Sequence, residues 1–314
     1  TDSGVHFKQD QSSSAWQGSD AQAWCKDFAG IDGNSVTDAF SAAELAAILE
    51  TTKSDAAFTS RSGASPNPFE ASEKILNRDK VFFLSAEEAE NSTYGFVDNN
   101  ARIANYGAIG LWWLRSPSLF PGAAGLVYND GHVDILHVSF GDCVARPAFN
   151  LDLNSVLFTS AAAGGKSSAA VGADAIFEIG DYTGNEWKLT VLDSSRNFSI
   201  SNATINGSSG TIGFSYSDAQ TGTNEYISVV IVDNGAITHY GRILQLDGTT
   251  NGASGTASLT LPAGVTLSDT TKLYVFNEQY NGGESDDTRL TDYGSELIDV
   301  QSAVEVGGQA VLGR

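Results

Sequence analysis

The chain has 314 residues and a mass of 33.0 kDa, a length that favours two domains over one. Its 38 acidic and 17 basic residues give a formal net charge of −21, which repels phosphate backbones and anionic lipids and so excludes nucleic acids and membrane surfaces as main ligands. Two cysteines, Cys25 and Cys143, are too few for a disulfide scaffold, although one bridge between them stays open, and no apolar run approaches the roughly 20 residues of a membrane-spanning helix.

The N-terminus carries no targeting signal. The chain begins at Thr1 and contains no methionine, and it lacks the basic stretch followed by an apolar stretch that marks a secretory signal. We therefore expect this sequence to be a mature or trimmed part of a longer exported chain.

A helix is predicted in the first half of the chain, residues 1–160, where helical patches alternate with Gly- and Asn-rich stretches. Ser41 and Glu44 have the spacing of a capping box, in which each side chain pairs with the other residue's backbone N–H. Apolar side chains follow at helical spacing, so the pattern predicts a helix over residues 41–51.

The same capping signature returns at Ser85 and Glu88. It follows the apolar run Val-Phe-Phe-Leu at residues 81–84, which is typical of a buried strand. The order predicted here is a strand, a cap and a short helix.

Residues 111–153 combine two apolar ends with a chemically mixed middle. The ends read Trp-Trp-Leu-Arg-Ser-Pro at 112–117 and Arg-Pro-Ala-Phe at 146–149, which supply large apolar groups and arginines able to pair when buried. Between them, Asn-Asp-Gly at 129–131 predicts a hairpin turn, flanked by aromatic, histidine and carboxylate side chains. Core packing alone would not require such mixed chemistry.

The second half of the chain is predicted to be all β. Residues 161–174 are mostly small and lack apolar periodicity, which indicates a linker. Residues 175–306 are predicted to form an immunoglobulin-like sandwich, and residues 307–314 a tail. Strand-like alternation recurs, with Asn-Gly turns at 206–207 and 234–235. The predicted strands span residues 187–192, 198–200, 210–216, 226–232, 237–246, 257–261 and 273–276.

No local catalytic motif is present. The chain lacks Gly-x-Ser-x-Gly, His-Glu-x-x-His and a glycine-rich phosphate loop. Two carboxylates sharing a cleft, as in glycosidases, stay open as an alternative, but a solvated acidic surface is the simpler interpretation. No EF-hand spacing occurs either, which leaves a structural Ca²⁺ in a surface loop as an open alternative.

The ends and hairpin of residues 111–153 resemble a family of surface proteins from Gram-positive gut bacteria. That family has an α+β C-type-lectin-like fold related to formylglycine-generating enzymes, and some members are variable proteins of diversity-generating retroelements. Residues 40–45 and 80–89 also fit, so the resemblance covers about half of the chain. The second half looks like the β-sandwich module that often follows such a domain.

The resemblance implies that residues 118–143 form a diversified ligand-binding face on a fixed frame. Aromatic, histidine and carboxylate side chains on turn-rich backbone agree with this, since they suit a binding surface. The implied frame consists of Trp112, Trp113, Arg115, Arg146 and Pro147. The implied variable positions are Leu119, Phe120, Leu126, Tyr128, His132, Asp134, Ile135, Leu136, His137, Ser139, Phe140, Asp142 and Cys143.

Several of these positions have a simpler interpretation. The apolar ones among them, residues 126, 135, 136 and 140, also suit ordinary core packing, because alternate residues of a hairpin face opposite sides. His132 and His137 suit a metal shared across the hairpin less well than they suit exposed binding positions. Cys25 has no neighbouring histidine in sequence and is predicted to be a buried free thiol rather than a nucleophile.

The sequence therefore predicts an extracellular or cell-surface recognition protein without catalytic activity. Its ligand would be a protein or a glycan, with no nucleic-acid partner, no membrane insertion of this chain, no cofactor and no metal in the site. Two alternatives stay open: an enzyme on the formylglycine-generating fold and a structural adhesin or stalk component. The oligomeric state is not predicted.

Overall fold

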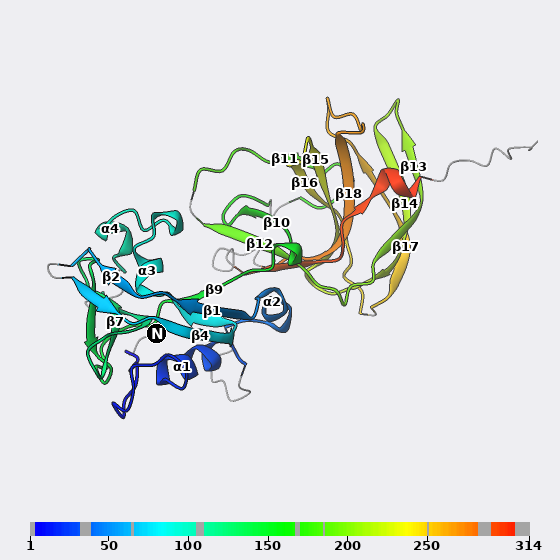
Figure 1. Ribbon diagram of the computed structural model, residues 1–314. Coiled ribbons are helices and arrows are strands. Elements are labelled where there is room, and N and C mark those ends of the chain that lie inside the picture. The colour runs from blue at the N-terminus through cyan, green and yellow to red at the C-terminus, as the bar shows by residue number, and fades with distance from the viewer. Residues whose placement is uncertain are drawn as a thin grey trace, which may run out of the picture. The chain divides into compact units, whose positions relative to one another are not determined.

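The chain folds into two compact units, Thr1–Asp152 and Leu153–Arg314, drawn from blue to green and from green to red in Figure 1. The computed structural model describes residues 4–31, 39–63, 66–104, 110–166, 170–184, 186–249, 251–281 and 290–304; the predicted tail at 307–314 lies outside them. Within these ranges, no helix has the length and apolar character needed to cross a membrane.

The boundary between the units differs from the predicted one. It falls after Asp152 rather than near residue 160, because the strand that follows already belongs to the second unit's sheet. The predicted linker at 161–174 is also not a free connector, since Lys166 within it is buried and ion-paired. Its small residues gave no apolar periodicity, so composition alone did not indicate that burial.

The first unit starts its helices with side-chain caps. Both predicted capping boxes are confirmed, Ser41 with Glu44 and Ser85 with Glu88. The helix predicted over 41–51 is shorter, because Ile48 is already extended and a strand begins three residues later. The helices are α1 (Asp20–Phe28), α2 (Ala42–Ala47), α3 (Ala86–Ala89), η1 (Ser92–Tyr94) and α4 (Asn99–Arg102).

The strands of the first unit form three two-stranded ribbons and one three-stranded sheet. The ribbons pair β1 (Thr51–Asp55) with β4 (Ser72–Asp79), β2 (Phe58–Ser60) with β3 (Asn67–Phe69), and β5 (Val81–Phe83) with β9 (Pro147–Phe149). The sheet contains β6 (Trp112–Pro117), β7 (Ala123–Val127) and β8 (Val133–His137). The predicted strand at 81–84 and the hairpin at 129–131 are thereby confirmed.

The second unit is all β, as predicted. A curled eight-stranded sheet has the order β10-β12-β19-β18-β15-β16-β11 with β20 beside β18, and a three-stranded sheet has the order β13-β14-β17. The strands are β10 (Val156–Ala161), β11 (Phe177–Glu178), β12 (Trp187–Leu192), β13 (Ser199–Asn206), β14 (Thr211–Ala219), β15 (Glu225–Asp233), β16 (Ala236–Gln245), β17 (Ala253–Thr260), β18 (Thr271–Gln279), β19 (Asp292–Gly294) and β20 (Ile298–Asp299).

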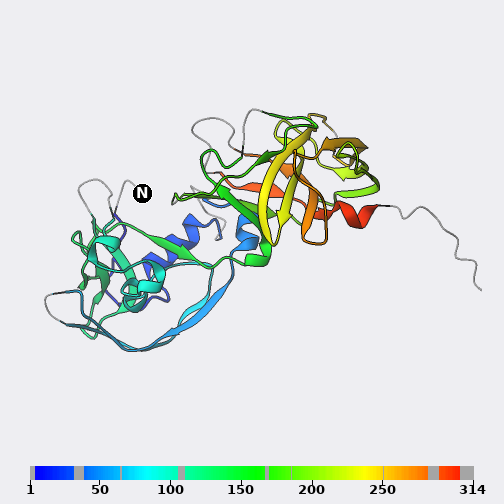
Figure 2. The same cartoon turned by 90° about the horizontal axis from the view of Figure 1, so that it is seen from above.

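The turns and core of this unit follow from the sequence pattern. Asn234 and Gly235 have φ angles of 50° and 85°, the left-handed conformation that a tight hairpin between β15 and β16 requires. Apolar side chains from both sheets fill one core, with Ile212 and Val229 fully buried. Figure 2 shows the short helix η3 (Val300–Ala303) in red, beside the three-stranded sheet to which Val304 adds a bridge at Ala203.

The pairing differs from an immunoglobulin-like sandwich in two respects. The strands divide eight to three, and β12 and β19 run parallel, whereas immunoglobulin sheets are antiparallel. Strand spacing in the sequence therefore predicted the all-β class but could not predict which strands pair.

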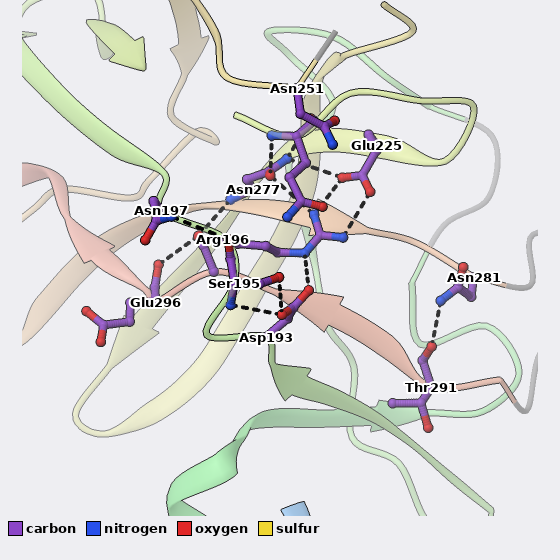
Figure 3. A network of polar contacts seen from close by, with 12 residues as sticks. Asp193, Ser195, Arg196, Asn197, Glu225, Asn251, Asn277, Asn281, Thr291 and Glu296 are labelled. Atoms are coloured by element: carbon purple, nitrogen blue, oxygen red, sulfur yellow. Dashed lines mark hydrogen bonds and ion pairs between the residues drawn. The ribbon is translucent and has the colours of Figure 1, made fainter. Parts of the chain in front are cut away.

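A buried arginine links separate parts of the second unit. The guanidinium of Arg196 donates to both carboxylate oxygens of Glu225 at 2.6 and 2.9 Å, to Asn277 at 3.2 Å and to Asp193 at 3.2 Å (Figure 3). These partners come from β15, β18 and the segment after β12, so one side chain connects three segments of the chain.

Candidate functional site

The predicted binding segment rests on a buried ionic frame around Arg115 in β6. This guanidinium is fully buried and donates to both oxygens of Asp55 at 2.8 and 3.0 Å, to Glu88 at 2.6 Å and to the carbonyl of Phe83 at 2.8 Å. Burial by itself raises the pKa of Glu88, but Arg115 and the Lys53 ammonium outweigh it and lower the pKa to about 2. Glu88 and Arg115 are therefore both charged at neutral pH and pair with each other.

Two tryptophans complete the frame. The guanidinium of Arg146 lies over two aromatic rings, and its central carbon is 4.7 Å from the ring centre of Trp112 and 5.3 Å from that of Phe96. Trp113 donates its indole N–H to the carbonyl of Val5 at 2.6 Å, which ties the N-terminal segment to β6. The predicted frame residues are all buried or half-buried, namely Trp112, Trp113, Arg115, Arg146 and Pro147.

In the β7–β8 hairpin, β7 is buried on both faces, and β8 is buried or half-buried up to its exposed last residue, His137. Leu126 packs into one hydrophobic cluster, whereas Val127 and Val133 pack into a second cluster on the opposite face. Leu136 and Ile135 are half-buried, one against each cluster. Leu126 was predicted on the binding face, and this is corrected: it is a core residue, because the hairpin lies between two cores.

The cysteines are buried as well. Cys143, predicted as a variable contact position, is fully buried with Cys25 in the same cluster, and neither forms a disulfide. The placement of Cys143 on the binding face is therefore corrected. Burial raises the pKa of both thiols, for Cys143 to about 12, so both stay protonated at neutral pH. The predicted free thiol at Cys25 is confirmed.

Two neighbouring turns expose apolar and aromatic side chains. We call Leu119, Phe120, His137 and Phe140 the loop cluster. Leu119 and Phe120 are each 55% exposed and Phe140 is 36% exposed. The turns are joined because the N–H of Val138 donates to the carbonyl of Gly122 at 2.9 Å. Within the second turn, the N–H of Phe140 donates to the carbonyl of His137 at 2.9 Å.

The N-terminal segment supports the loop cluster, which the sequence did not indicate. His6 lies beside Ser139, with a distance of 2.8 Å between Nδ1 and the carbonyl oxygen. The N–H of Lys8 donates to Val138 at 2.9 Å, so this segment runs along the end of the hairpin. Residues more than 130 positions apart meet here, and no local motif marks such a meeting. Asp142, the last exposed position predicted in the segment, lies in the loop beyond.

The hairpin tip forms a second, partly exposed group. The ring of Tyr128 stacks on His132 at 4.6 Å with an interplanar angle of 6°. Asp130 contacts Nδ1 of this histidine, and a carboxylate oxygen of Asp134 lies 3.5 Å from Nε2. Gly131 makes the turn feasible, because a Cβ there would lie 1.8 Å from the carbonyl oxygen at the start of α4.

A metal shared by His132 and His137 does not fit this geometry. His132 directly precedes β8 and His137 is its last residue, so five residues of extended chain separate them by roughly 16 Å, far beyond two bonds to one ion. Among the residues that the structure describes, no group of three or more histidines, cysteines or carboxylates is placed to hold a metal.

Comparison with known proteins finds a family match over the first unit. Residues 2–153 match the family model described as a domain of unknown function, DUF6273, and this range nearly coincides with the unit Thr1–Asp152. No curated protein and no solved structure matches the chain.

Proposed function

We propose that the first unit is a C-type-lectin-like ligand-binding domain that contacts its ligand through the loop cluster and the hairpin tip. The exposed apolar side chains on the two turns carry this proposal. Leu119, Phe120 and Phe140 leave large apolar surfaces in water, whereas the frame residues Trp112, Trp113 and Arg115 are fully buried. Rigid aromatic groups on turns make effective contact residues, because little conformational entropy is lost when they bind.

The separation of frame and surface supports diversification of residues 118–143. Exposed positions away from packed features usually change stability by only about 0.5 kcal/mol when substituted, whereas core changes typically cost roughly 1 to 3 kcal/mol. The diversified set in this proposal excludes the two core residues and keeps the exposed and half-buried ones. These are Leu119, Phe120, Tyr128, His132, Asp134, Ile135, Leu136, His137, Ser139, Phe140 and Asp142.

We also propose display on the cell surface, with a protein or glycan as the ligand. The net charge of −21 favours a domain that stays soluble and does not adhere to its own copies. Labelling of intact cells with an antibody against the chain tests this placement, and labelling that requires cell lysis would contradict it.

The coding locus gives the most direct test of diversification. We expect a near-copy of the DNA that encodes residues 118–143, differing from it mainly at adenines, close to a reverse transcriptase gene. A locus without such a copy would remove diversification from the proposal while leaving ligand binding open.

Binding itself is tested on the full chain with an immobilised panel of glycans and surface proteins. Phe120→Ser and Phe140→Ser should each weaken retention at least about tenfold, since each removes an aromatic anchor that the bound ligand would cover. Val97→Ser is the matched control, because Val97 is 71% exposed in the same unit but lies outside the loop cluster. Equal losses in all three variants would show that the loop cluster is not the contact surface.

A further inference from the structure

The second unit buries a cluster of four charged side chains within its curled sheet. The ammonium of Lys166 lies 2.6 Å from Glu278 Oε1 and 2.7 Å from Asp292 Oδ2. A second ammonium, that of Lys188, lies 2.8 Å from the other oxygen of Asp292. The side chains of all four are at most 3% exposed, so solvent does not screen them.

The surroundings of Lys166 are largely aromatic. Its Nζ lies 4.8 Å from the ring centre of Phe158 and 5.2 Å from that of Tyr240. Burying two lysines and two carboxylates in such a place carries a large desolvation penalty, and the attraction between them seldom exceeds that penalty. Stability alone therefore gives a weak reason for this arrangement, and its chemistry has to be considered.

The two oxygens of Asp292 lie in different environments. Oδ1 accepts from the ammonium of Lys188 at 2.8 Å and from the backbone N–H of Asn281 at 2.7 Å. The Asn281 amide also donates to the carbonyl of Thr291 at 2.8 Å, which fixes the residue before the carboxylate (Figure 3). Oδ2 instead faces Lys166. Two donors thus stand where negative charge would develop if a nucleophile attacked the carboxyl carbon.

The proton positions favour the same reaction. Burial, together with the nearby Glu278 carboxylate, raises the pKa of Asp292 and favours its neutral acid. Burial opposes ionisation of Glu278 as well, but Lys166 outweighs it and lowers the pKa of that carboxyl. Burial disfavours the charged form of Lys166, but Glu278 and Asp292 outweigh it and raise the pKa of that lysine, which therefore starts as an ammonium. A neutral acid, an ammonium and a carboxylate base that can take its proton thus meet at one point.

We propose that Lys166 and Asp292 condense into an intramolecular amide, with Glu278 accepting the proton of the amine. The contact of 2.7 Å between Nζ and Oδ2 places the nitrogen next to the carboxyl carbon, which replaces a bimolecular encounter by a fixed geometry. The bond would join Lys166, in the segment that follows β10, to Asp292 in β19, and so link two distant parts of the second unit covalently.

The step balances without an outside reagent. The ammonium of Lys166 first passes one proton to Glu278, and the freed lone pair forms a bond with Cγ of protonated Asp292. The C–Oδ2 bond then breaks, and the hydroxyl takes a second proton from the nitrogen through Glu278 and leaves as water. The products are one amide, one water molecule and a protonated Glu278.

Lys166 rather than Lys188 is the nucleophile because only Lys166 also contacts the base, at 2.6 Å from Glu278. Lys188 lies at the oxygen that becomes negative and donates in addition to the carbonyl of Asn281, so its role is to stabilise charge.

The intact mass of the denatured full chain tests the proposal. We expect a mass about 18 Da below that calculated from the sequence, the mass of one water. A digest should contain one branched peptide that joins Lys166 to Asp292. A wild-type mass equal to the calculated one overturns the proposal, and a branched peptide containing Lys188 overturns the assignment of the nucleophile.

Variants identify the participants. Lys166→Arg keeps the positive charge but cannot form the amide, and its mass should equal the calculated mass. Lys272→Arg is the matched control, because Lys272 pairs with Asp299 at 3.6 Å on a partly exposed surface and should keep the full loss of water. Glu278→Gln should retain a β-type circular dichroism spectrum and lack the bond; bond formation in that variant overturns the role of the base. The wild-type mass decides the proposal even where a variant fails to fold.

Discussion

Replacement of Arg115 by methionine removes the central cation of the buried frame while keeping most of its apolar stem. The change leaves two carboxylates, Asp55 and Glu88, buried without the guanidinium that contacts them at 2.8 and 2.6 Å. Removing one partner of a buried pair costs roughly 3 to 5 kcal/mol, because the remaining charge cannot be solvated. Domains are stable by about 5 to 15 kcal/mol, so the first unit should lose a large part of its stability.

Urea unfolding of the full chain, followed by tryptophan fluorescence, measures this loss. Four of the five tryptophans lie in the first unit, so the signal reports mainly on that unit. With a slope of about 2 kcal/mol per M, a loss of 4 kcal/mol moves the midpoint by about 2 M. Arg78→Met is the matched control: its 2.6 Å pair with Glu50 is exposed and screened by solvent, so its loss should leave the midpoint almost unchanged. Midpoint shifts of similar size in both variants would refute the reasoning.

Three further predictions concern the first unit. The folded-state pKa of Glu88 is about 2 against an ordinary 4.5, so the ionised carboxylate should contribute roughly 3 kcal/mol to the free energy of unfolding. This contribution should be complete above pH 4.5 and disappear as the pH falls towards 2. Acid titration of the unfolding midpoint checks this, and Glu88→Gln should flatten the profile. Cys25 and Cys143 should react with a thiol reagent only after unfolding, because both are buried and protonated, and rapid labelling of the native chain would contradict that burial. Gly131→Ala should lower the melting temperature by more than Gly95→Ala. Both glycines have positive φ, but only at Gly131 would an added Cβ clash with backbone atoms. Equal shifts would argue against the close approach of the backbone at Gly131.

Local signals in the sequence were reliable wherever neighbouring residues determine the structure. Both capping boxes form because hydroxyl and carboxylate lie one helical turn apart and need no distant partner. The turn at residues 234–235 forms because asparagine and glycine tolerate left-handed backbone. The helix predicted over 41–51 ended early because β1 pairs with β4, a contact that helical periodicity does not report.

The candidate binding segment shows how far a periodic pattern can be interpreted. Alternation predicted that Leu126 and Val127 face opposite sides of the hairpin, but it could not show that a core covers each side. The exposed positions of the segment consequently lie in its turns and loops, namely the loop cluster, the hairpin tip and the loop with Asp142. His6 joins that region from the other end of the first unit.

The sequence by itself determined the all-β second half, the hairpin at 129–131 and the acidic, cysteine-poor character of the chain, because these depend on composition and on short-range geometry. Only the tertiary structure decided that Cys143 is a core residue and that Lys166, within an apparent linker, is buried between Glu278 and Asp292. Burial is a property of what packs against a residue, and the two carboxylates that pair with Lys166 lie more than 100 positions away.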